Sequence, residues 1–260
     1  MNHASDYPDL SAPSARLMLS EARAPFEFVR FLMRASRQKD LPPGDGHAVM
    51  LIPGFGVSDV ALKPLARAID RLGYATYGWG EGVNLGMRRE IRHNLVIRLR
   101  ALNERHASAV SLIGWSLGGV FAREMARANP QLVRRVISLG SPINGHPAAN
   151  NMMPLFRLAN RGKPVNEDLE GFNRRKIAPP VPCTAIYSRT DGVVAWQACL
   201  EEPAENTENL QVSASHFALP FNLDALACIA QRLAIPEPQA DQSGSSAKQP
   251  VSKTGPADQK

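Results

Sequence analysis

Residues 109–128 read AVSLIGWSLGGVFAREMARA. A short apolar run opens this stretch, Gly114-Trp115-Ser116-Leu117-Gly118-Gly119 follows, and apolar side chains at helical spacing close it. This order predicts a buried strand, a sharp turn and an amphipathic helix. Such a turn would lift the hydroxyl of Ser116 clear of a sheet, and glycines two positions before and after it would let strand and helix pass closely. A glycine-rich turn with an incidental serine is the alternative.

The same alternation of short apolar runs and longer amphipathic runs extends from residue 47 to residue 234. Strands are predicted at 48–53, 74–79, 109–114, 133–140, 183–188 and 209–215, and helices at 58–72, 87–106, 117–128 and 219–234. This order predicts an α/β protein with a mostly parallel sheet of about six strands and helices on both faces. Ligands of such sheets bind beyond the carboxyl ends of the strands, so the loops that follow strands are where chemistry is expected.

The two ends of the chain differ from this body. Residues 1–13 and 236–260 are poor in apolar side chains, which predicts a flexible N-terminus and a disordered tail around one domain at 14–235. Residues 14–39 predict an amphipathic helix with a break near Pro25. This helix could pack onto the domain or make weak peripheral contact with a membrane, and both alternatives are open. Its apolar side chains near helical spacing are Leu17, Ala22, Phe26, Val29 and Met33.

Composition excludes several classes of protein. The chain of 260 residues has no apolar run near the roughly 20 residues of a membrane helix, and residues 1–16 lack the apolar core of a secretory signal. Its net charge of +6 is spread as arginines among acids, so no nucleic-acid partner is expected. The three cysteines, Cys183, Cys199 and Cys228, lack metal-binding spacing and predict a reduced, cytoplasmic protein.

Two later residues could activate Ser116. A serine hydroxyl needs a base to take its proton, and the base needs an orienting carboxylate. Asp191 follows the predicted strand at 183–188, and His216 follows the one at 209–215. Both positions lie beyond strand ends, at the edge where Ser116 emerges. Asp191 could instead only shape an Asp-Gly turn, and His216 could be an ordinary surface histidine.

An oxyanion formed on an attacked carbonyl needs two backbone N–H donors. The amide of Leu117, directly after the serine, is one candidate. The other is the amide of Phe55 in the loop Pro53-Gly54-Phe55-Gly56, which follows the first predicted strand. An ordinary tight turn is the alternative for this loop.

These residues resemble the α/β-hydrolase superfamily, in particular its esterase-like and lipase-like bacterial members. The matching pieces cover about residues 47–234: Leu51-Ile52-Pro53-Gly54-Phe55-Gly56, Gly114-Trp115-Ser116-Leu117-Gly118-Gly119, Tyr187-Ser188-Arg189-Thr190-Asp191-Gly192-Val193-Val194 and Ser215-His216. Many relatives carry histidine where this chain has Pro53, which leaves the geometry of the oxyanion loop open. Fuller members have eight strands, so the resemblance implies that a first antiparallel pair is replaced by the N-terminal helix.

The resemblance also implies a substrate pocket. The superfamily often inserts a cap where this chain has residues 144–180, and an apolar cluster there suits either an acyl pocket or a cap packed on the domain. The expected pocket residues are Trp115, Met152, Met153, Phe156 and Phe217.

The resulting hypothesis is a serine hydrolase that cleaves carboxylic esters through an acyl-enzyme, with Ser116, His216 and Asp191 as catalytic residues and no cofactor or metal. A small-molecule ester is the expected partner. A thioesterase, an acyltransferase or a cofactor-free peroxidase would use the same three residues. A non-catalytic binding or membrane-associated protein on the same fold is the alternative of another class.

Overall fold

The computed structural model describes residues 10–38, 40–144, 150–152, 154, 158–159 and 176–236. Within them, six strands form one parallel sheet in the order β2-β1-β3-β4-β5-β6. The strands are β1 (Ala48–Ile52), β2 (Ala75–Gly78), β3 (Val110–Trp115), β4 (Val133–Leu139), β5 (Cys183–Ser188) and β6 (Thr207–Val212). The predicted parallel six-stranded sheet is confirmed.

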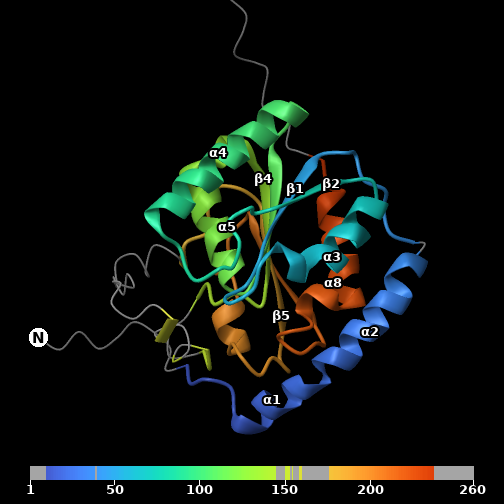
Figure 1. Cartoon of the computed structure of the whole chain (residues 1–260), viewed down its shortest axis with the longest axis vertical. Helices are drawn as coiled ribbons and strands as arrows, with labels where there is room; N and C mark the ends of the chain where they lie inside the picture. Colours follow the sequence, from blue (N-terminus) through green and yellow to red (C-terminus); the bar gives the residue numbers. More distant parts are fainter. Residues whose placement is uncertain are drawn as a thin grey trace, which may run out of the picture.

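Helices cover both faces of the sheet. Helices α3 (Asp59–Arg71) and α8 (Leu223–Leu233) lie on one face, and α4 (Arg89–His106) and α5 (Leu117–Ala128) lie on the other (Figure 1). The side chains of β1 alternate between two cores: Val49 and Leu51 join the core under α3 and α8, and Met50 joins the core under α4 and α5. This alternation follows from the two-residue period of a strand buried on both faces.

The N-terminal segment forms a bent helical unit outside the sheet. It comprises α1 (Ala15–Ser20), the 3₁₀ turn η1 (Glu21–Arg23), α2 (Ala24–Arg34) and the 3₁₀ turn η2 (Ala35–Arg37). The predicted break is present, just before Pro25, which occupies the first turn of α2 where its missing N–H is not needed.

The helix packs on the domain, but through a different face from its apolar stripe. Phe31 is buried and contacts the ring of Phe221, whereas Phe26, Val29 and Met33 are half or more exposed. The stripe expected from helical spacing is therefore largely a solvent-facing surface. Spacing identifies an apolar face, but polar contacts of Glu21 and Glu27 decide which face docks.

Two predicted boundaries at the C-terminal end were wrong. Strand β6 runs from Thr207 to Val212, because the backbone of Ala214 bonds to the hydroxyl of Ser188 instead of continuing the ladder. The final helix does not begin at residue 219. A 3₁₀ turn, η6 (Leu219–Phe221), comes first, and Asn222 then caps α8 by accepting the N–H of Ala225 at 2.9 Å.

Several expectations fall on other parts of the chain. Residues 1–9, residues 237–260 and most of the expected cap at 144–180 lie outside the described residues. Among the helices of the described part, none has the length and apolar character needed to cross a bilayer.

Candidate active site

Ser116 occupies a strained turn between β3 and α5. Its backbone has φ 52° and ψ −119°, a left-handed φ that L-residues rarely adopt, and its N–H donates to the carbonyl of Leu139 at 2.8 Å. A Cβ at Gly114 would collide with the backbone of Gly119, and one at Gly118 would collide with the carbonyl of Ile52. The glycines around the serine therefore permit the close crossing that the sequence pattern predicts.

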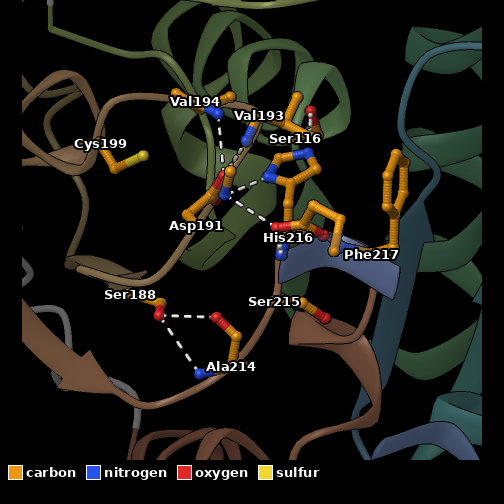
Figure 2. A network of polar contacts seen from close by, with 12 residues as sticks. Ser116, Ser188, Asp191, Val193, Val194, Cys199, Ala214, Ser215, His216 and Phe217 are labelled. Atoms are coloured by element: carbon orange, nitrogen blue, oxygen red, sulfur yellow. Dashed lines mark hydrogen bonds and ion pairs between the residues drawn. The ribbon is translucent and has the colours of Figure 1, made fainter. Parts of the chain in front are cut away.

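Ser116, His216 and Asp191 form a continuous hydrogen-bonded relay (Figure 2). The Nε2 atom of His216 lies 3.1 Å from Ser116 Oγ, and its Nδ1 atom lies 2.6 Å from Asp191 Oδ2. Because an ionised carboxylate only accepts hydrogen bonds, Nδ1–H donates to Asp191 and Nε2 is free to accept the proton of the serine. The three residues follow β3, β6 and β5, respectively, at one edge of the sheet.

The relay is shielded from water on the side of the acid. Asp191 and His216 are each 2% exposed, while Ser116 is half-buried. The second carboxylate oxygen, Asp191 Oδ1, accepts the N–H groups of Val193 and Val194, each at 2.8 Å. These bonds fix the carboxylate, so its other oxygen is aimed at the imidazole. The turn role considered for Asp191 is thus present together with its contact to histidine.

The loop at residues 53–57 passes directly beside the serine. A Cβ at Gly54 would lie 3.4 Å from Ser116 Cβ, at van der Waals distance, so the loop runs alongside the serine. The side chain of the fully buried Asn84 donates to the carbonyl of Pro53 at 2.7 Å, and its backbone exchanges hydrogen bonds with Gly56 and Val57. Asn84 thereby holds the loop of Phe55, a function that no sequence motif indicated.

Leu117 is the first residue of α5. The N–H of a first helical residue has no intrahelical acceptor, and the helix dipole adds positive potential there. With Gly54 in the loop of Phe55 also close to the serine, this arrangement could receive an oxyanion.

Gly140 is a second position that the sequence did not single out. It directly follows β4 with φ 57°, and a Cβ there would lie 3.2 Å from both Asp191 Oδ2 and His216 Nδ1. It would also lie 2.5 Å from Leu219 Cδ1. A glycine after a strand carries a weak signal, because nothing local shows that the acid and the base pack against it.

The expected pocket residues take different positions. Trp115 is buried, and its indole N–H donates to the carbonyl of His216 at 3.2 Å. Met152 packs against the apolar residues at 193–199. Phe217 is 39% exposed and its ring lies edge-on to His216 at 5.8 Å. Met153 and Phe156 lie outside the described residues.

Phe217 also borders a shallow, mainly apolar cleft of about 510 Å³, widely open to solvent, between the N-terminal helices and the loop of His216. The cleft is lined by Glu21, Ala22, Ala24, Pro25, Phe28, Phe217 and Phe221.

A second serine–histidine–aspartate arrangement lies at the opposite end of the sheet. His47 Nε2 is 2.8 Å from Ser111 Oγ, and His47 Nδ1 contacts Asp45. Ser111 is fully buried within β3, so no substrate can reach its hydroxyl. Burial is the main cause that lowers the pKa of His47, and the contact with Asp45 offsets only part of that shift. This cluster fits a structural role. It shows that serine, histidine and aspartate in hydrogen-bonding order do not make a catalytic site unless the serine is lifted clear of the sheet and accessible.

A nearby cysteine is not a competing nucleophile. Cys199 is fully buried, and burial followed by the negative charge of Asp191 raises its thiol pKa well above the ordinary value. The thiol therefore stays protonated and unreactive. Within the described part of the chain, no three histidine, cysteine or acidic side chains gather in a way that could hold a metal ion.

The chain matches no family model and no curated protein sequence. It is similar in structure to a metagenome-derived lipolytic enzyme from a study of LipS and LipT, with 18% identity, a TM-score of 0.54, and coverage of 74% of this chain and 93% of the other. Bacillus licheniformis lipase BlEst2 gives 15% identity, a TM-score of 0.56, and coverage of 75% and 94%.

A third similar structure is Paleococcus ferrophilus monoacylglycerol lipase, with 15% identity, a TM-score of 0.53, and coverage of 74% and 95%. The chain has the α/β-hydrolase fold. At these identities the likeness establishes the architecture, whereas the chemistry depends on the residues at the edge of the sheet.

Proposed function

We propose that the protein is a serine hydrolase that cleaves carboxylic esters through an acyl-enzyme. The observation that carries the proposal is the relay from Ser116 Oγ through His216 to Asp191, at 3.1 Å and 2.6 Å, on a strained turn at the carboxyl edge of the sheet. The lipolytic enzymes among the similar structures support an ester as the substrate.

The reaction proceeds in two steps. Ser116 Oγ bonds to the carbonyl carbon while its proton passes to His216 Nε2, and Asp191 stabilises the imidazolium. The amides of Phe55 and Leu117 receive the oxyanion. The tetrahedral intermediate collapses, and the leaving alcohol takes the proton from His216. Water then gives a proton to His216 Nε2 and attacks the acyl carbon. As the second tetrahedral intermediate collapses, the bond from this carbon to Ser116 Oγ breaks, the acid leaves, and His216 returns its proton to Ser116 Oγ.

The substrate site extends from Ser116 toward apolar side chains. Phe217 supports this assignment, because it borders both His216 and the apolar cleft. Trp115 acts from within the domain, through its bond to His216. Met152, Met153 and Phe156 would belong to the cap over this site. These positions favour an ester with an apolar acyl group.

An activity profile across p-nitrophenyl esters of increasing acyl length tests the function. Ester hydrolysis is expected for the wild type, and Ser116→Ala should lower kcat by about 10³-fold or more. Faster turnover of matched thioesters, or transfer to added alcohols, would reassign the reaction to a thioesterase or an acyltransferase. Absence of turnover on every acyl substrate would contradict the proposal.

We also propose weak contact between the N-terminal helices and an anionic membrane surface. The exposed apolar side chains of α2, including Phe26 at 74% and Met33 at 57%, lie on a helix that also exposes Arg30 and Arg34. An apolar face beside basic residues suits the interface of anionic lipids.

Sedimentation with vesicles measures this contact. Binding is expected to vesicles that contain phosphatidylserine, to weaken with salt, and to fall several-fold in Phe26→Asp. Equal sedimentation with and without vesicles, or no effect of Phe26→Asp, would reject it.

A cytoplasmic location is proposed as well. It is supported by the three cysteines, all of which are free thiols. Thiol labelling of the denatured protein from freshly lysed cells should report three reactive groups. A disulfide-linked form would speak against this location.

A further inference from the structure

The side chain of Glu21, in the turn η1, reaches into the site from the N-terminal segment. The residue is 6% exposed. Its Oε1 accepts the N–H groups of Gly192 and His216, each at 2.8 Å, and its Oε2 accepts the N–H of Phe217 at 3.2 Å. A single carboxylate therefore binds the loop that carries Asp191 and the loop that carries His216.

Two neighbours of Glu21 reinforce this connection. Glu27 Oε2 accepts the N–H of Ser215 at 3.1 Å and also the hydroxyl of that serine. Arg23 pairs with Glu27 at 3.1 Å and donates to the hydroxyl and the carbonyl of Thr190, at 2.6 Å and 3.2 Å. Charged side chains from residues 21–27 thus hold the backbone on both sides of the Asp191–His216 contact.

The contact between acid and base depends on the placement of both loops. Asp191 and His216 lie in the loops after the neighbouring strands β5 and β6, so their separation of 2.6 Å depends on how these two loops are placed. Ser188 and Thr190 already join the loops at the backbone of Ala214, and Glu21 adds bonds directly beside Asp191 and at His216 itself. An oxygen that accepts an N–H from each loop fixes their relative position directly. Bonds from amides to an ionised carboxylate are short and strong, and the buried setting favours them further. A displacement near 1 Å at such a site can cost about 100-fold in rate.

The N-terminal segment and the loop of Asp191 are closely packed as well as hydrogen-bonded. A Cβ at Gly192 would collide with the carbonyl of Leu17 in α1. The loop of the acid therefore packs directly against the N-terminal helices, and its glycine makes room for them. Helix α2 also contacts the turn η6, so this packing continues past His216.

We propose that Glu21 is a positioning residue for the relay, an inference that rests on the proposed function for its kinetic consequence. Both carboxylate oxygens accept backbone N–H groups, so Glu21 is assigned no contact with the reacting carbonyl. It acts by holding the backbone of His216 and of the Asp191 loop in the geometry that aligns Nδ1 with the carboxylate and Nε2 with Ser116 Oγ.

Three variants test the proposal on a short ester, which has little contact with the cleft. Glu21→Ala is expected to lower kcat by about 10–100-fold, with KM within about twofold. Glu21→Gln keeps one oxygen that can accept from Gly192 and His216, so it should recover most of the activity. Phe31→Leu is the control, because it loosens the packing of α2 without removing a bond to either loop. It should lower Tm but keep kcat within about twofold.

A direct probe of the relay accompanies the kinetics. The Nδ1–H proton between His216 and Asp191 should give a low-field NMR resonance that disappears in His216→Gln. The same resonance should shift or broaden in Glu21→Ala and persist in Phe31→Leu. If Glu21→Ala does not fold, Glu21→Gln decides alone, with an expected loss of about twofold to threefold in kcat and a shifted resonance.

The outcomes separate the two proposals. A folded Glu21→Ala with wild-type kcat and an unchanged resonance would overturn the role of Glu21, as would a Phe31→Leu variant that loses kcat in proportion to Tm. A wild type without esterase activity, whose resonance still depends on Glu21, would overturn the proposed function and leave the positioning role standing.

Discussion

At the scale of single residues, the site depends on positions where a side chain would not fit. Gly140 adopts φ 57° beside the Asp191–His216 pair, and a Cβ there would come within 3.2 Å of both bonding atoms. Gly140→Ala should lower kcat about tenfold or more, because the pair must move to admit the methyl group. A left-handed alanine also costs about 1–2 kcal/mol of stability. Steady-state kinetics and thermal unfolding measure both effects.

Gly46→Ala is the matched control for Gly140. Gly46 has φ 82° and no atom within 4 Å of its would-be Cβ, so the substitution carries the backbone cost alone. Its Tm should fall while its kcat stays near that of the wild type. Wild-type kcat in Gly140→Ala would show that the pair does not depend on the space beside it.

The sequence located the residues that could take part in chemistry but not those that hold them. Ser116, Asp191 and His216 were predictable because each follows a strand, and parallel strands bring their carboxyl ends to one edge. Glu21 was not, since its bond to His216 spans 195 positions and no local pattern marks a glutamate for such a contact. Asn84 and Gly140 were not predicted either, because no local pattern marks them for their contacts with the site.

At the scale of elements, most boundaries of helices and strands could be predicted, because the spacing of apolar residues and the turn residues determine them locally. The exceptions are places where side chains replace the regular bonding pattern. Ser188 bonds to the backbone of Ala214 and ends β6 early, and Pro220 with the cap of Asn222 delays the last helix. Which face of α2 docks was likewise set by tertiary contacts, not by its spacing of apolar residues.

Glu208 ties the edge strand β6 to α8 and to β5. Its carboxylate accepts two hydrogen bonds from Arg232, both at 2.8 Å, and one from Thr184 at 2.7 Å. The hydrogen bond with Arg232 is the main cause that holds the pKa of Glu208 below its ordinary value, against the opposing effect of burial. A lowered pKa means that this group stabilises the fold above its unfolded pKa, and that the stabilisation is lost as pH falls through the folded pKa.

Glu208→Gln should therefore lower Tm at pH 7, by a few degrees at most because the pair is partly exposed. The deficit should shrink as the pH is brought to about 3. Unfolding of both proteins between pH 3 and pH 7 measures it, with the exposed Glu205→Gln as control. A deficit that does not change with pH would assign the effect to packing instead of charge.

At the scale of the whole molecule, we propose one domain at 14–235 with a cap at 144–180 and loose ends. The carbonyl of Ile235 accepts hydrogen bonds from Arg134 at 3.1 Å and Arg135 at 2.7 Å, which anchors the end of the domain to β4. A chain that ends at Pro236 should keep its Tm within about 1 °C and its kcat within twofold. A chain that ends at Leu233 should lose Tm by several degrees, because it leaves both arginines without this acceptor.

The central claim is that Ser116 is a nucleophile activated by His216. A fluorophosphonate probe followed by peptide mass spectrometry tests it most directly. The wild type should carry the probe on Ser116, Ser116→Ala should not be labelled, and His216→Gln should react at least about 10³-fold more slowly. Label on another residue, or equal labelling of the wild type and Ser116→Ala, would contradict the account.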